Sequence, residues 1–167
     1  RPFKLEDIEK IIVHGSRVTV DHVGWPYKPQ GLTSAQLNLP YCIATYLLEG
    51  DAFVAQFTED KVADPQRIEV SKIVDVVEDP AITALGSRFR HKVRVEIRFK
   101  QGDVQEETVE APRGSEKKFA TEDDVIAKFR KLSETQFSRA KTDQIIDLVM
   151  NAEKLTSAQD ISKALQA

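Results

Sequence analysis

The chain has 167 residues, 41% hydrophobic and 31% charged, so it can bury the core of one domain with an extension, without disulfides or metals. Its net charge of −3 gives no reason to expect nucleic acid or an anionic membrane as a partner. No apolar run approaches the roughly 20 residues needed to cross a bilayer. No signal peptide is visible, and one cysteine cannot form an internal disulfide, so we expect a cytoplasmic protein.

The first apolar segments are predicted to form a strand and then a loop. β-Branched residues alternate with other residues over residues 17–23, a pattern typical of a strand. Residues 24–31 contain two prolines and two glycines and are not expected to form a regular element. The chain begins at Arg1 rather than Met and passes directly into structured-looking sequence, as a piece of a longer protein would.

The segment TSAQLNLPYCIATYLLEGD predicts a helix over residues 39–50. Asn38 is a suitable N-cap, Pro40 is tolerated in the first helical turn, and Gly50 is typical of a helix end. Tyr41 then lies in the first turn, where backbone N–H groups lack partners and the helix dipole favours anions.

A β-hairpin is the clearest local prediction. A short helix from Pro65 and a strand over residues 73–77 precede it. Apolar and charged residues then alternate over residues 93–100, Gln-Gly-Asp makes a turn, and weaker alternation returns over residues 104–111. This pattern predicts a hairpin with one solvated face.

A basic stripe runs up to and through the predicted hairpin, and it comprises Arg88, Arg90, Lys92, Arg94, Arg98 and Lys100. Its density suggests nucleic acid, but alternation places Arg94, Arg98 and Lys100 on the outer face, opposite Glu106, Glu107 and Glu110. Cross-strand ion pairs are the simpler prediction. Binding of DNA or RNA with a steep salt dependence stays open as an alternative.

Beyond residue 115 the sequence predicts helices. Thr121 and Asp124 resemble a capping box, and Ser138 is a suitable start for a second helix. Thr156 with Gln159 is predicted to cap a third helix.

These patterns predict an α+β fold. Residues 1–115 are expected to form an antiparallel sheet with helices packed on one face. Residues 116–167 are expected to form an all-helical segment, because no strand pattern appears in them.

Metal and thiol chemistry are not predicted. Cys42 has no second cysteine near it and is interpreted as a small apolar side chain. His14, His22 and His91 have no spacing typical of a metal site, so solvated or capping roles are expected for them.

Tyr41 is the candidate for chemistry. It follows Ser34, Gln36 and Asn38, a strip of polar residues beside a loop. A phenol at a helix N-terminus is well placed to hold a carboxylate or to donate a proton. A buried tyrosine of the core is the alternative interpretation.

The same segment resembles the A-x-x-S-x-x-Y-x-x-A-x-x-L-x-x-G signature of the MmgE/PrpD family. The similarity continues through FTEDKVADP, through VRVEI with its turn KQGD, and through APRGSEKKFATEDDVIAKFRKL. The family includes 2-methylcitrate dehydratase, cis-aconitate decarboxylase and iminodisuccinate epimerase.

The resemblance implies a two-domain enzyme with its active site between the domains. Residues 1–115 would match the smaller α+β domain, often called the lid, and residues 116–167 the last helices of a large helical domain. The rest of that helical domain, with a lysine and histidines for acid–base chemistry, would lie upstream of Arg1 as a partner in the same chain. No metal or organic cofactor is implied.

The family's signature tyrosine falls at Tyr41, which the resemblance makes a catalytic proton donor or carboxylate anchor facing the cleft. Ser34, Gln36 and Asn38 would contact substrate. Two departures stand out, because the family's serine is Asn38 and its Pro-Leu pair is Phe119 and Ala120.

The expected function is therefore that of the C-terminal part of an enzyme acting on a small polycarboxylate, with a 2-methylcitrate dehydratase-like lyase preferred. The reaction would abstract a proton next to a carboxylate and then lose water, lose CO₂ or be reprotonated. An epimerase, a decarboxylase and a non-catalytic carboxylate-binding or dimerisation module remain alternatives. Apolar faces on the last helices predict self-association, with a homodimer as the expected state.

Overall fold

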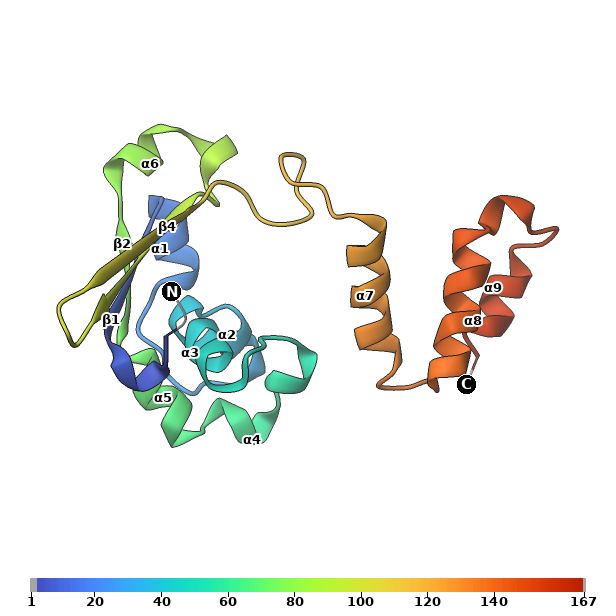
Figure 1. The fold of residues 1–167 in the computed structure, drawn as a ribbon, viewed down its shortest axis with the longest axis horizontal. Helices are drawn as coiled ribbons and strands as arrows, with labels where there is room; N and C mark the ends of the chain where they lie inside the picture. Colours follow the sequence, from blue (N-terminus) through green and yellow to red (C-terminus); the bar gives the residue numbers. More distant parts are fainter. Residues whose placement is uncertain (1–2, 167) are drawn as a thin grey trace. The chain divides into compact units, whose positions relative to one another are not determined.

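The computed structural model describes residues 3–166 and divides the chain into two compact units, Arg1–Pro112 and Arg113–Ala167. The first unit contains a four-stranded sheet and six short helices, and the second contains helices (Figure 1). The α+β class is thus confirmed. No helix within residues 3–166 is long and apolar enough to cross a membrane.

Most of the helices of the first unit lie between its first two strands in the sequence. The strands are β1 (Ile8–Gly15), β2 (Val74–Glu78), β3 (Val93–Phe99) and β4 (Val104–Val109). The helices are α1 (Arg17–Val23), α2 (Leu32–Gln36), α3 (Leu39–Glu49), α4 (Glu59–Val62), α5 (Pro65–Ser71) and α6 (Pro80–Ala84).

The sheet has the strand order β2-β1-β3-β4. β3 and β4 form the predicted antiparallel hairpin, and β1 is antiparallel to β3. The expectation of an antiparallel sheet needs one correction, because β1 and β2 are parallel, with Ile11 opposite Val74. The connection between them contains α1 to α5, and a crossover of this length is what a parallel pair requires.

The segment predicted as a strand over residues 17–23 is helix α1, and the preceding residues form the strand. Ser16 Oγ caps α1 by accepting a hydrogen bond from the Thr19 backbone N–H. A Cβ on Gly24, just after α1, would lie 3.0 Å from the Val76 Cβ, so the absence of a side chain lets α1 end against β2. The cap and this close packing outweigh the strand propensity of the valines.

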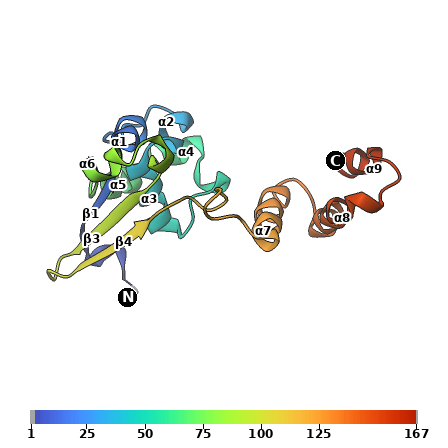
Figure 2. The same cartoon turned by 90° about the horizontal axis from the view of Figure 1, so that it is seen from above.

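The core of the first unit lies on one face of the sheet. Its buried residues are Ile8, Ile11, Val13, Val74 and Phe99. Apolar residues along one side of α3 pack against them, so α3 covers this face (Figures 1 and 2). The helix has its predicted bounds, since Asn38 caps it and Gly50 ends it with a φ of 71°, which a glycine adopts without strain.

The opposite face of the sheet carries charged residues. Arg94 Nη1 lies 2.8 Å from Glu106 across the hairpin, as predicted. Arg98 instead pairs with Glu96 on its own strand, at 2.5 Å, which corrects the predicted cross-strand pair. The hydrogen bond from Arg98 lowers the pKa of Glu96, and His14 lies 3.5 Å from the same carboxylate and lowers it further.

The second unit contains α7 (Glu122–Ser133), α8 (Arg139–Met150) and α9 (Gln159–Ala164). The capping box of α7 is confirmed, because Thr121 Oγ1 accepts from the Asp124 N–H and Asp124 accepts from the Thr121 N–H. The Ser138 cap of α8 is also confirmed.

The predicted cap of α9 is wrong. The helix begins at Gln159 after Ala158, which has no capping side chain, and the Gln159 N–H donates to Ser157 Oγ at 3.2 Å rather than to Thr156. Both residues are short hydroxyl side chains, and local spacing alone did not distinguish them.

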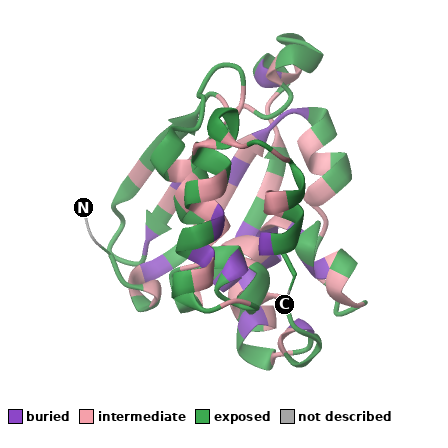
Figure 3. Cartoon of the chain, turned by 90° about the vertical axis from the view of Figure 1, so that its right-hand side faces the viewer, coloured by how far each residue is buried: buried purple, intermediate pink, exposed green. Residues whose placement is uncertain are grey.

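Large apolar side chains stay exposed on the second unit. Val125 is 59% exposed and Val149 is 49% exposed. A hollow of about 130 Å³ is lined by apolar residues of α7 and α8, namely Val125, Ile126, Phe129, Ile145, Ile146, Val149 and Met150. Within α7 and α8 the buried residues are Ser133, Thr142 and Ile145, and the others are intermediate or exposed; Figure 3 colours the chain by burial.

Candidate functional site

The predicted polar strip begins in α2 and ends at the start of α3. Asn38 is fully buried, and both ends of its side chain bind the chain itself. Its Oδ1 accepts from the Tyr41 N–H at 2.9 Å, and its Nδ2 donates to the Trp25 carbonyl at 2.6 Å. Asn38 therefore caps α3 and ties the preceding loop to it.

The other two residues of the strip are more accessible. Ser34 is half-buried and Gln36 is exposed, and both lie in α2. Cys42, one turn into α3, directs Sγ towards the carbonyls of Ala35 and Gln36, each 3.6 Å away. Burial raises the pKa of Cys42 to about 11, so the thiol stays protonated at neutral pH, in keeping with an apolar role.

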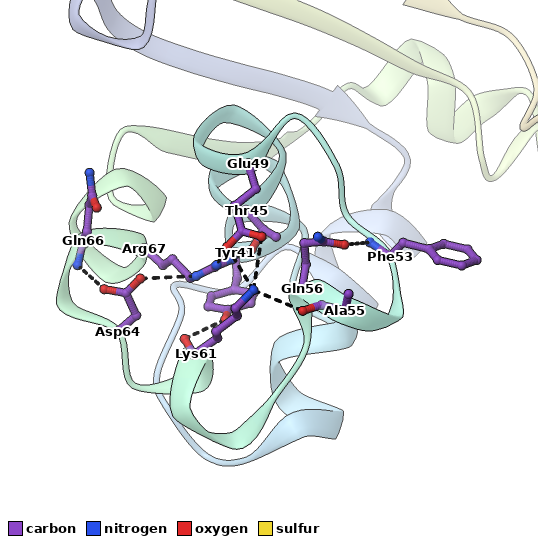
Figure 4. Close-up of polar contacts among 10 residues, drawn as sticks. All are labelled: Tyr41, Thr45, Glu49, Phe53, Ala55, Gln56, Lys61, Asp64, Gln66 and Arg67. Atoms are coloured by element: carbon purple, nitrogen blue, oxygen red, sulfur yellow. Dashed lines mark hydrogen bonds and ion pairs between the residues drawn. The ribbon is translucent and has the colours of Figure 1, made fainter. Parts of the chain in front are cut away.

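Tyr41 lies inside the first unit, with no exposed surface. Its ring packs against Tyr27, with centroids 4.3 Å apart, and against Phe57 at 6.0 Å. Its hydroxyl donates to the Lys61 carbonyl at 2.8 Å, as Figure 4 shows. In this arrangement the phenol touches protein groups on every side.

Tyr27 and Tyr41 donate hydrogen bonds to the same helix. The Tyr27 hydroxyl donates to the Val62 carbonyl at 2.8 Å, next to the carbonyl that Tyr41 holds, and both carbonyls belong to α4. Burial raises the pKa of Tyr27 to about 12 and also raises the pKa of Tyr41. Both phenols therefore stay protonated at neutral pH and can donate only if a ligand replaces α4 as the acceptor.

An ionic cluster centred on a buried arginine lies beside Tyr41 (Figure 4). Arg67 of α5 is 3% exposed, donates to Thr45 Oγ1 at 3.1 Å and pairs with Glu49. Its Nε lies 3.3 Å from Asp64 as an ion pair without hydrogen-bond geometry. Lys61 Nζ completes the cluster at 3.1 Å from Glu49.

The cluster contains two cations and two carboxylates, so its charges balance internally. Burial of unpaired charge is costly, and each ion here has an opposite partner. The cluster joins α3, α4 and α5, and it holds the backbone to which Tyr41 is bonded.

The ionic cluster was not predicted from the sequence. Tyr41, Thr45 and Glu49 are spaced by four, which places them on one face of α3. That face also carries two polar groups, a signal that a buried polar partner must exist. The partner, Arg67, lies 22 residues after Thr45, beyond the reach of a local pattern.

No metal site is visible within residues 3–166, where no group of three or more His, Cys, Asp or Glu could hold an ion.

The sequence of the chain is similar to that of known proteins. The sequence model described as "MmgE/PrpD C-terminal domain" matches residues 1–153, and the chain therefore belongs to the MmgE/PrpD family.

Two curated relatives are both named cis-aconitate decarboxylase, one from Aspergillus terreus (strain NIH 2624 / FGSC A1156) and one from Aspergillus terreus. Each is 26% identical over 166 residues, which cover 97% of this chain and 33% of the relative. The chain thus spans about a third of the length of the curated relatives it matches.

Proposed function

We propose that the chain is the C-terminal part of a lyase that acts on a small polycarboxylate in the cytoplasm. The observation that carries this proposal is the family match over residues 1–153. The likeness to two cis-aconitate decarboxylases over 97% of the chain supports it. Dehydration of 2-methylcitrate and loss of CO₂ from cis-aconitate are the two reactions to test.

The proposed reaction begins with removal of a proton next to a carboxylate. Positioned protein acids and bases suffice for this step and for protonation of the product, so we propose no metal or organic cofactor. The groups that remove the proton would come from the part of the enzyme outside this chain.

Tyr41 remains the residue of this chain that we propose for the reaction, with Ser34, Gln36 and Asn38 as neighbouring polar contacts. Its bond to the Lys61 carbonyl favours a positioning role, in which the phenol holds α4 in place. Direct donation of a proton to substrate would require α4 to move away from the ring. Asn38, with its amide bound to Trp25 and Tyr41, supports the start of α3 in the same way.

We propose a helical domain of the same enzyme as the partner of the second unit. The apolar residues of α7 and α8 that line the 130 Å³ hollow would pack on it. Where that domain is missing, exposed apolar surface of this kind favours self-association. A homodimer is the proposed state of the intact enzyme, and nucleic acid and membrane are not proposed as partners.

The test is an activity assay of the intact gene product with the 167-residue chain beside it. The substrates are 2-methylcitrate, citrate and cis-aconitate, with products followed by NMR. We expect turnover of one substrate by the intact protein and none by the chain alone. Failure of the intact protein to convert any of the three would contradict the proposal.

A further inference from the structure

A hollow of about 820 Å³ opens on the first unit, and we call it the basic pocket. Val18 and Val23 of α1, Leu37 between α2 and α3, and Val93 of β3 are among its apolar walls. Leu37 lies between Gln36 and Asn38, so the pocket borders the predicted polar strip. Its ionisable residues are His22, Arg90 and His91.

The backbone of Arg90 is anchored at the wall of the pocket. Its carbonyl accepts two hydrogen bonds, from Ser16 Oγ at 3.0 Å and from Thr19 Oγ1 at 2.9 Å. Ser16 is buried and caps α1, so these bonds join the loop before β3 to the start of that helix. The side chain of Arg90 therefore extends from a fixed point.

The guanidinium of Arg90 has N–H donors that bond to no other described residue. Its Nε donates to His91 Nε2 at 3.0 Å, which makes that ring nitrogen an acceptor. Among residues 3–166 its two terminal nitrogens have no hydrogen-bond or ion-pair partner, and the ring of His22 has none either. A guanidinium with two open N–H donors matches the two oxygens of a carboxylate.

The pocket lacks the carboxylates that neutralise other arginines of this unit. Arg17, Arg67 and Arg94 each pair with Asp or Glu side chains. No Asp or Glu is among the described residues that line the basic pocket. A positively charged wall beside apolar ones suits a small organic anion, because one part of the ligand is charged and the rest is hydrocarbon.

We propose that the basic pocket binds a carboxylate of a small organic acid. Arg90 provides the bidentate contact, His22 provides a second donor, and the apolar walls hold the carbon chain. The identification of this acid with the enzyme's substrate rests on the proposed function. The anion site itself rests on the geometry of the pocket.

The experiment is a titration of the ¹⁵N-labelled 167-residue chain, followed by NMR. Tricarballylate is the probe, since it is a tricarboxylate with no double bond to react, and inorganic phosphate at equal ionic strength is the comparison. We expect saturable shifts around Arg90 and His22 with tricarballylate. Phosphate binding as tightly as tricarballylate would overturn the carboxylate assignment.

Single-residue variants distinguish binding in the pocket from a general attraction of anions to positive charge. Arg90→Gln should weaken tricarballylate binding by about tenfold or more, because it removes a charge-assisted bidentate contact. His22→Gln should weaken it less. Arg88→Gln removes an equal charge two residues away, outside the pocket lining, and should change binding by less than about twofold. Equal losses in Arg88→Gln and Arg90→Gln, or no saturable binding, would overturn the site.

The intact enzyme distinguishes this proposal from the proposed function. Arg90→Gln should raise KM for the carboxylate substrate far more than it lowers kcat, which is the signature of lost substrate binding. An intact enzyme that is active and unaffected by Arg90→Gln would overturn the site as a substrate site and leave the function standing. An inactive enzyme whose C-terminal chain still binds tricarballylate would support the site and contradict the function.

Discussion

Arg1–Pro112 buries its apolar side chains around a sheet, whereas Arg113–Ala167 leaves a row of them exposed on α7 and α8. The first unit also pairs a buried arginine with two carboxylates and holds the phenols of buried Tyr41 and half-buried Tyr27 on backbone carbonyls. In the second unit, Ile145 is the large apolar residue that is fully buried, among those described. The first unit thus carries its own core, whereas the second buries little apolar surface, which is why we propose a partner domain for it.

The largest expected effect comes from the ionic cluster. Arg67→Met removes the buried guanidinium that pairs with the partly exposed carboxylates of Glu49 and Asp64 and bonds to Thr45, and should destabilise the first unit by about 2–4 kcal/mol. Arg130→Met is the matched control in the second unit, where Arg130 pairs with Asp143 at a partly exposed site and about 1 kcal/mol or less is expected. Urea denaturation monitored by hydrogen exchange measures both, and equal losses would remove this contrast between the units.

Tyr41→Phe is expected to have the next largest effect on stability. It removes the phenol's hydrogen bond to the Lys61 carbonyl, which still accepts from the Asp64 N–H at 3.2 Å, so we expect a loss of about 0.5–1.5 kcal/mol in unfolding free energy. Tyr46 lies on the same helix and is 60% exposed, so Tyr46→Phe should be near neutral. A stability of Tyr41→Phe equal to that of the original chain would show that the phenol is not needed to hold α4.

In the intact enzyme, Tyr41→Phe tests whether Tyr41 takes part in the reaction. A catalytic Tyr41 would lower turnover by an order of magnitude or more when replaced by Phe. Tyr27→Phe removes a similar bond to α4 and serves as the control. Equal small effects of the two variants on turnover would assign Tyr41 a structural role.

Low pH should destabilise both units, and in each unit one carboxylate is responsible. Arg98 lowers the pKa of Glu96, and the Thr121 N–H lowers the pKa of Asp124. A lowered pKa means that the stabilisation is present above the ordinary pKa of about 4 and is lost as pH falls through the lower folded value. Glu96→Gln should flatten this loss in the first unit alone, and amide exchange at pH 5 and pH 3 would show it. Unchanged acid sensitivity of the first unit would contradict this role of Glu96.

The smallest expected change in stability is at the exposed apolar row. Val149→Ser should alter the unfolding free energy by about 0.5 kcal/mol or less, because Val149 is half exposed. It should, however, reduce self-association measured by sedimentation. Val104→Ser, at a similarly exposed position on the hairpin, should leave association unchanged. A monomeric chain with fully protected amides in α7 and α8 would contradict the partner surface.

Local signals predicted some elements well. The start and end of α3 were predicted from Asn38 and Gly50, because a cap and a left-handed glycine act within one turn. The hairpin of β3 and β4 was predicted from alternation and a short turn, which also involve near neighbours. The buried phenol was among the interpretations of Tyr41 that the sequence left open.

The sequence by itself thus determined the α+β class, the helix that carries Tyr41 and the capped starts of α7 and α8, since each depends on contacts within a few residues. Only the tertiary structure decided that residues 17–23 are helical, that β1 and β2 are parallel, and that Arg67 lies beside Glu49. It also decided that Arg90 and His22 share a pocket, although they are 68 residues apart. These outcomes depend on packing between distant segments, and no local pattern encodes which segments meet.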